Sequence, residues 1–86
     1  MLVMAAPVPE AEIFGKTLRK LRLGKELTQE RLAGAAGLTT GYVNTVERGM
    51  QVPSLTTILK LAHALGVTPS ELLSDFTPAA VRRLVG

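Results

Sequence analysis

The sequence predicts an all-α fold, a compact domain of five short helices with a candidate short sixth helix at its C-terminus. Its 86 residues and mass of 9.1 kDa leave room for one domain, and so small a core needs economical packing. Hydrophobic residues make up 47% of the chain and aromatic residues only 3%, which predicts a core of Leu, Val, Ile and Ala between closely packed helices. No stretch shows the β-branched alternation of a strand, so no sheet is expected.

The first eleven residues are expected to form a flexible tail. The opening segment, MLVMAAPVP, is apolar, has no positive charge ahead of it and contains two prolines, so it is a poor signal peptide and too short to cross a bilayer. No other segment approaches the roughly 20 apolar residues of a membrane helix. We therefore expect a cytoplasmic protein with no membrane partner, divided into a tail (1–11), a helical domain (12–76) and a C-terminal extension (77–86).

Two helices are predicted in the first half of the domain. From Glu12 to Gly24 apolar residues recur at helical spacing. Their core stripe consists of Phe14, Leu18 and Leu21. Thr28 is a suitable N-cap for a second helix over Gln29–Ala36, and Gly37 is placed to end it.

A third helix follows at once. Thr39 is its predicted N-cap, the helix covers Thr40 to Arg48, and Gly49 stands where a left-handed residue ends a helix. Only Gly37-Leu38-Thr39 connects it to the preceding helix. Three connecting residues that begin with glycine force the two helices to cross sharply, which is the geometry of a helix-turn-helix.

The second half of the chain predicts three more helices. Ser54 caps a fourth, which Gly66 ends. Its apolar stripe consists of Leu55, Ile58, Leu59, Ala62 and Leu65. Thr68-Pro69-Ser70-Glu71 is a capping box with proline in the first turn, which predicts a short fifth helix. Thr77-Pro78 repeats that signal before Ala79–Val85, the candidate sixth helix.

The third predicted helix has two different faces when its residues are placed 100° apart. Its inner side carries Tyr42, Val43 and Val46, and its outer side Thr40, Gly41, Asn44, Thr45 and Arg48. The outer side has no acid and consists of short polar side chains with one arginine at the end. Such a face suits close insertion into the major groove of DNA, whereas an ordinary solvated face carries Lys and Glu pairs.

The positive charge is concentrated in the same half of the chain. The net charge is +3, with a balance of −2 over residues 1–15, +4 over 16–49 and +1 over 50–86. A basic segment of this kind attracts nucleic acid or another acidic surface.

No catalytic or metal centre is expected. The chain has no cysteine and a single histidine, His63, so it can form no disulfide and no nitrogen and sulfur metal site. Its carboxylates are scattered over different helices and form no acid and base pair. We expect no enzyme, no cofactor and no small-molecule ligand.

Taken together, the motifs between Phe14 and Leu73 resemble the phage-repressor and Cro type of helix-turn-helix domain, also called the Xre family. The resemblance rests on Leu27-Thr28-Gln29, Ala33 with Gly37, Tyr42-Val43, Val46-Glu47-Arg48-Gly49, Pro53-Ser54 and Ala64-Leu65-Gly66-Val67. It implies a lambda-repressor-like five-helix fold that binds operator DNA as a homodimer and regulates transcription.

The resemblance also implies roles for particular residues. Gln29 matches a glutamine that holds a DNA phosphate and braces the recognition helix. The positions that match residues facing base edges are Thr40, Gly41, Asn44 and Thr45. Those that match positions near phosphates are Tyr42, Arg48 and Ser54. Arg22 and Glu47 match an ion pair between the first and third helices. The expected DNA-binding residues are Gln29, Thr39, Thr40, Gly41, Tyr42, Asn44, Thr45, Arg48 and Ser54.

Three positions depart from the family pattern. Glu26 replaces a glycine in the bend after the first helix, so that bend has to form without it, with Gly24 as a substitute. Gly41 provides no side chain at a base-facing position and costs the helix roughly 1 kcal/mol relative to alanine. The loop over residues 50–52 has no Lys or Arg, which predicts weaker phosphate affinity.

Three functions remain open at this level. The first is a dimeric, sequence-specific transcriptional regulator, most simply a repressor, that reads a near-palindromic operator with residues 40–48. The second is an antitoxin or restriction-modification controller with the same DNA-binding domain. The third is a protein-protein interaction module that has lost DNA binding, a function that an acid on the outer face of the third helix would have favoured.

The C-terminal region is the expected dimer surface. It carries more apolar side chains than a small core can cover, namely Leu72, Leu73, Phe76, Val81, Leu84 and Val85. Arg82 and Arg83 are expected at the rim of that surface, and the N-terminal Leu2, Val3 and Met4 are the alternative cover for it in a monomer.

Overall fold

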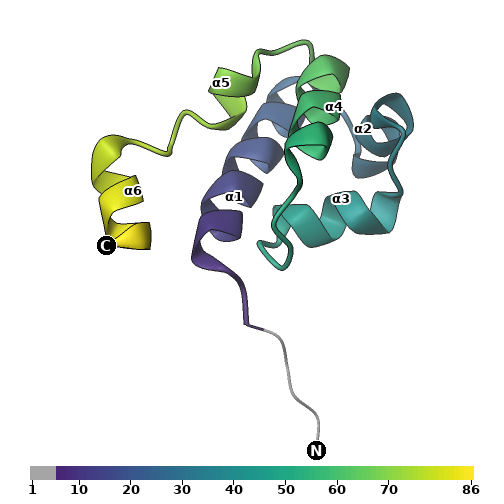
Figure 1. Ribbon diagram of the computed structural model, residues 1–86. Helices are drawn as coiled ribbons and strands as arrows, with labels where there is room; N and C mark the ends of the chain where they lie inside the picture. Colours follow the sequence, from purple (N-terminus) through teal and green to yellow (C-terminus); the bar gives the residue numbers. More distant parts are fainter. Residues whose placement is uncertain (1–5) are drawn as a thin grey trace, which may run out of the picture.

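Six helices and no strand are formed by residues 6–86, the part of the chain that the computed structural model describes (Figure 1). Their bounds are α1 Pro9–Gly24, α2 Gln29–Ala36, α3 Thr40–Glu47, α4 Leu55–Leu65, α5 Pro69–Leu72 and α6 Pro78–Val85. The all-α fold is confirmed. The second helix has the bounds predicted for it. The fourth lies, as predicted, between its cap Ser54 and its terminal glycine Gly66.

α1 begins earlier than its apolar stripe indicates, because Pro9 and not Glu12 is its first residue. The backbone of Val8 is extended and its N–H donates to the carbonyl of Gly49 at 2.9 Å, which holds the start of α1 against the end of α3. Ala11 is 1% exposed and belongs to the core. Residues 9–11, predicted as tail, are therefore helical, and the predicted tail over 1–5 lies outside the described residues.

The bend between α1 and α2 is made by Glu26. Its φ of 58° is left-handed, whereas Gly24, the residue expected to make the bend, is still helical. The turn is closed by hydrogen bonds from Lys25 and Leu27 to the carbonyl of Arg22, at 3.2 and 3.1 Å. A side chain at a left-handed position costs about 1–2 kcal/mol, so these contacts override the local preference.

The α2-turn-α3 unit forms as predicted. Thr28 accepts a hydrogen bond from the N–H of Arg31, and Thr39 from the N–H of Tyr42, at 3.0 and 3.1 Å. Gly37 takes a φ of 68° after α2. Ala33 is 2% exposed within the core, as expected for a small residue where two helices approach.

The core lies between α1, α2, α3, α4 and α5, and α2 packs against both α3 and α4. Its largest fully buried side chains are Leu18, Leu32, Leu61, Leu72, Val43 and Val46. Burial of one such side chain contributes about 1.5–3 kcal/mol. The prediction of an aliphatic core with few aromatics is confirmed, and Phe14, at 2% exposed, is the aromatic residue among the buried side chains of the core cluster.

α1 and α3 meet at a glycine. A Cβ on Gly15 would stand 2.6 Å from the carbonyl oxygen of Glu47 and closer still to that of Val46. A Cβ on Gly49, whose φ is 73°, would stand 2.8 Å from the Cα of Glu12. These two close approaches fix the distance and direction of α3 relative to α1.

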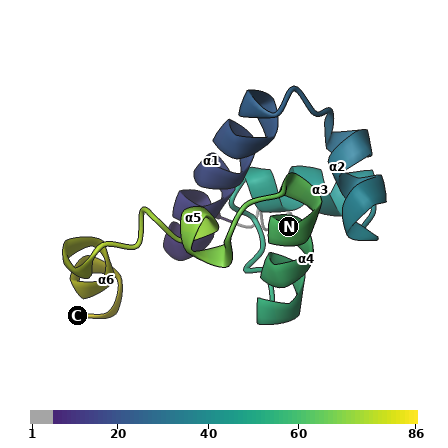
Figure 2. The same ribbon diagram turned by 90° about the horizontal axis from the view of Figure 1, so that it is seen from above.

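α6 stands apart from the other helices in both views (Figures 1 and 2). Thr77 caps it by accepting from the N–H of Ala80 at 3.2 Å, and Pro78, one residue before the predicted start, occupies its first turn. Val81 and Val85 are 40% and 80% exposed. Leu72, predicted as part of an uncovered C-terminal surface, is instead fully buried, so that surface begins after it.

Candidate nucleic-acid interface

The outer face of α3 lies where the sequence placed it. Val43 and Val46 on its inner side are each 1% exposed, and Tyr42 is half-buried against the core. Of the outer residues, Thr40, Gly41 and Arg48 are exposed, whereas Asn44 and Thr45 are half-buried. Arg48 follows the last helical residue as the C-cap.

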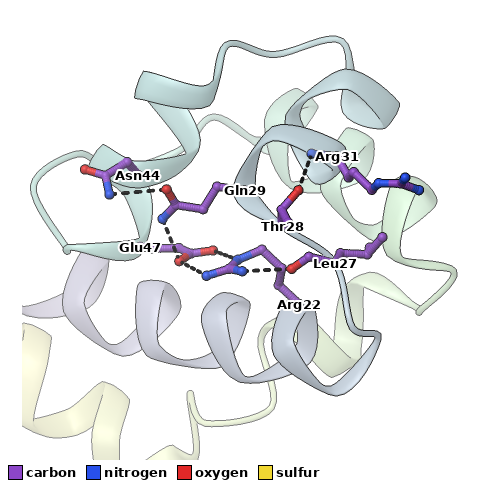
Figure 3. A network of polar contacts seen from close by, with 7 residues as sticks. All are labelled: Arg22, Leu27, Thr28, Gln29, Arg31, Asn44 and Glu47. Atoms are coloured by element: carbon purple, nitrogen blue, oxygen red, sulfur yellow. Dashed lines mark hydrogen bonds and ion pairs between the residues drawn. The ribbon is translucent and has the colours of Figure 1, made fainter.

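A buried polar network holds α3 from below (Figure 3). Arg22 on α1 donates from Nε and Nη2 to the two carboxylate oxygens of Glu47 on α3, at 2.6 and 2.9 Å. Its Nη1 donates to the carbonyl of Leu27 at 2.8 Å. The side chains of Arg22 and Glu47 are 9% and 3% exposed, so the inter-helix pair that the family resemblance implied is present and buried.

The same carboxylate orients the next residues in the network. Glu47 can only accept, so Gln29 presents its amide nitrogen to it at 3.1 Å and its amide oxygen to Asn44. Asn44 donates to that oxygen at 3.4 Å, which is a weak bond. Because Glu47 can only accept hydrogen bonds, it sets the orientation of the Gln29 side-chain amide. The side-chain amide oxygen of Asn44 points away from the network (Figure 3).

The ion pair also fixes the charge of its arginine. The hydrogen bond from Arg22 to Glu47 raises the pKa of the guanidinium above its ordinary value and outweighs the opposite effect of burial. Arg22 therefore remains charged, and its charge is used inside the protein.

Two other polar residues of the predicted site also have partners within the chain. The Thr45 hydroxyl donates to the carbonyl of Gly41 at 2.9 Å, which leaves its oxygen lone pairs and its methyl group for other contacts. Ser54, the N-cap of α4, accepts from the N–H of Thr57 at 3.1 Å and donates to the Thr57 hydroxyl at 3.0 Å. The first two N–H groups of α4 have no intrahelical acceptor.

The structure adds Arg19 to the residues around α3. A polar pocket of about 290 Å³ is lined by Arg19, Arg22, Gln29, Asn44, Glu47 and Arg48. The pocket brings three of the predicted site residues, Gln29, Asn44 and Arg48, close to α1. Ser54 does not line this pocket. Arg19 was counted only within the basic segment over residues 16–49 and was not among the expected DNA-binding residues. The available signal was its spacing, because a residue three positions before Arg22 lies on the same side of a helix.

Residues 6–86 contain neither a metal-binding cluster nor a membrane span. Within them no three His, Cys, Asp or Glu side chains gather into a group that could hold a metal ion. Over the same residues, no helix combines the length and apolar character needed to cross a membrane.

Comparison with known proteins agrees with this geometry. A sequence profile of helix-turn-helix proteins matches residues 18–72. The chain is 44% identical over 66 residues to the control protein C.BamHI of Bacillus amyloliquefaciens, an alignment that covers 76% of this chain and 80% of that protein. It is 51% identical to the restriction-modification controller protein C.AhdI of Aeromonas hydrophila, with a TM-score of 0.72 over 73% of this chain and 96% of that one.

A third relative extends over α6. The hypothetical transcription factor NHTF of Neisseria matches with a TM-score of 0.72 at 32% identity, covering 99% of this chain and 98% of that one. Fold and site together define a helix-turn-helix protein. The chain belongs to the phage-repressor and Cro type of this family, as its motifs predicted.

Proposed function

We propose that this protein is a sequence-specific transcriptional regulator that binds duplex DNA with α3 in the major groove. The observation that carries the proposal is the acid-free outer face of α3, held in place by the buried network from Arg22 through Glu47 and Gln29 to Asn44. A short helix fits a groove about 12 Å wide, and a rigid support presents its side chains at fixed positions to the bases.

The proposed contacts divide into readers and positioners. Asn44 can pair bidentately with adenine through its outward oxygen and its second amide hydrogen, and the methyls of Thr40 and Thr45 can pack on thymine. Gly41 reads no base and lets the backbone approach the groove. Phosphates are held by Arg48 and by the α2, α3 and α4 N-termini, where Gln29, Thr39 and Ser54 lie, with Tyr42 beside the backbone.

Selection from a random duplex pool with the purified protein tests the proposal. We expect an enriched motif and an affinity that falls steeply with salt, with about 0.9 added to the log-log slope for each neutralised phosphate. If every duplex in the pool binds more weakly than about 10⁻⁵ M at moderate salt, DNA binding is contradicted. The fold would then serve protein-protein interaction.

Single substitutions are expected to separate reading from positioning. Asn44→Ala should cost about 1–3 kcal/mol on the selected site and little on unrelated DNA. Arg48→Ala and Arg19→Ala should weaken binding to all duplexes alike and lower the salt slope by about one each. The matched control is Lys60→Ala, an exposed base on α4 outside the pocket. Unchanged site preference in Asn44→Ala would remove Asn44 from the reading set.

A homodimer on a near-palindromic site is part of the proposal. One small domain with short recognition side chains contacts too few base pairs to select a genomic address, whereas two domains with half-sites about 34 Å apart supply the missing specificity. Four exposed large apolar side chains support a dimer surface in the C-terminal half, because Val52 and Leu73 line one apolar groove and Val81 and Val85 lie on α6.

Within this function, a controller of a restriction-modification system is the candidate that the comparisons favour, since C.AhdI carries that name at 51% identity and C.BamHI is named a control protein at 44%. The selected operator tests it directly. If the motif lies upstream of genes for a restriction endonuclease or its control protein, the role is supported. If it lies only elsewhere in the genome, the role is contradicted while DNA binding stands.

A further inference from the structure

An apolar groove lies on the side of the protein where α1 begins. It has a volume of about 210 Å³, and α1, the loop before α4, α4 itself and the chain after α5 contribute to its lining. The residues that matter here are Glu10, Phe14, Val52, Ile58, Leu73 and Phe76. Val52 and Leu73 are 55% and 37% exposed, and no residue of α6 lines the groove.

α6 is amphipathic and is not seated in this groove. Placing successive residues 100° apart gathers four of its apolar side chains, Ala80, Val81, Leu84 and Val85, into a sector of about 140°. Ala80 is 5% exposed and Leu84 is half-buried in the chain itself, so the open part of this sector is formed by Val81 and Val85, at 40% and 80% exposed. Arg82 and Arg83 stand on either side of that sector. Within residues 6–86 the structure records one ion pair, between Arg22 and Glu47, so neither arginine of α6 has a carboxylate within 4.0 Å.

We propose that α6 of each chain packs into the groove of a second copy, so that two chains exchange their C-terminal helices. This inference rests on the proposed homodimer and assigns its contacts. Each copy offers one groove and one amphipathic helix, so a two-fold arrangement fills both grooves and leaves no open end. A helix laid with its apolar face in an apolar groove is a common recognition mode.

Charge favours a second copy as the occupant. Glu10 lines the groove and is exposed. The arginines flank the apolar face of α6, so one of them would meet this carboxylate when the helix is inserted. In its own chain α6 stands apart from α1 and α4 (Figures 1 and 2), and none of its residues lines the groove, which leaves the groove open to the helix of a partner.

The exchange would couple dimerisation to the DNA-binding face. Val52 and Pro53 line the groove and belong to the loop that joins α3 to α4. A helix packed on this loop would fix the end of α3 that carries Arg48, and the start of α4 that carries Ser54. Dimer formation would therefore order the elements that contact the phosphates.

Cysteine cross-linking tests the exchange, because the chain contains no cysteine of its own. Val52→Cys and Val81→Cys are made as separate full-length variants, both at exposed positions, and are mixed before oxidation. We expect a disulfide-linked pair of chains in the mixture and at least tenfold less in either variant alone. Strong cross-linking of Val81→Cys alone would mean that α6 pairs with α6, which contradicts the exchange.

Two further outcomes would also overturn it. Cross-linking within single chains of the double variant at high dilution would show that α6 folds back onto its own groove. A full-length protein that sediments as a monomer at about 100 µM, or a chain ending at Ser74 that dimerises equally well, would remove the role of α6. If these results appear while the random pool still yields a motif, the exchange fails and the DNA-binding function stands.

A charge reversal gives an independent readout. Arg82→Glu combined with Arg83→Glu should raise the dimer dissociation constant at least tenfold, and Glu10→Lys added to them should restore part of it. Lys25→Glu, at an exposed position outside the groove, is the control and should leave dimerisation unchanged. Absence of any loss in the double variant, or of any recovery with Glu10→Lys, contradicts the proposed pairing.

Discussion

Replacing Gly15 by alanine is expected to destabilise the fold by about 3 kcal/mol. The new Cβ would be forced against the carbonyl oxygens of Val46 and Glu47, with the second at 2.6 Å. These atoms are main-chain groups of α3 and cannot rotate away, so α1 and α3 would have to separate. That loss exceeds the roughly 1 kcal/mol that alanine gains over glycine within a helix. Urea unfolding, followed by circular dichroism, measures it.

Gly34→Ala is the matched control. Gly34 also lies within a helix, and a Cβ there has no neighbour within 4 Å. It should therefore show only the helix preference and stabilise the protein by up to about 1 kcal/mol. Opposite signs for the two substitutions are the expected result. A Gly15→Ala protein as stable as the unmodified chain would show that α1 and α3 do not approach as closely as described.

Local signals predicted the helix boundaries well. Five residues cap helices with their hydroxyl groups, as the sequence indicated, namely Thr28, Thr39, Ser54, Thr68 and Thr77. A cap acts within three residues of itself, so its effect is visible in a short stretch of sequence. The α2-turn-α3 geometry was predictable for the same reason, since a short connection with a left-handed glycine determines it.

Features that depend on distant contacts were not predictable from the residues. Gly15 in a helix looks unfavourable until α3 is placed against it, and Pro9 starts α1 only because Val8 bonds to Gly49. Glu26 takes a left-handed conformation that its residue type disfavours. In each case a tertiary contact outweighs a local preference of about 1 kcal/mol, and the sequence displays only the preference.

The candidate site was predicted in part. Helical spacing gave the outer face of α3, and family resemblance gave the pair of Arg22 with Glu47. The structure adds how the pair reaches the outer face, through Gln29 to Asn44. That route joins three helices, so no single periodic pattern contains it. Arg19 was not predicted, because its place beside Asn44 and Arg48 depends on how α1 packs against α3.

Removing one partner of the Arg22 and Glu47 pair is expected to cost about 3–5 kcal/mol, as much as the Gly15 substitution or more. The two side chains are 9% and 3% exposed, so a lone charge left behind would be poorly hydrated. Arg22→Met and Glu47→Leu each leave such a charge. For a domain of this size that loss is most of the stability, so both single variants should unfold at much lower urea concentrations than the unmodified chain.

The double variant Arg22→Met with Glu47→Leu should be more stable than either single variant, because no buried charge remains. It will not regain full stability, since the Leu27 carbonyl and the Gln29 amide lose their partners, at about 1–3 kcal/mol for each group left unsatisfied. Urea unfolding of the four proteins closes the cycle. Additive losses would show that the two residues do not interact.

Salt distinguishes this buried pair from the charges on the DNA-binding face. A desolvated pair is screened weakly, so raising the salt from 0.05 to 0.5 M should change the coupling energy of the cycle by less than about 0.5 kcal/mol. Over the same range DNA affinity should fall by orders of magnitude, because exposed bases such as Arg48 act by releasing counterions from phosphates. A coupling energy that disappears with salt would place the pair at the surface and remove the support that it gives to Gln29 and Asn44.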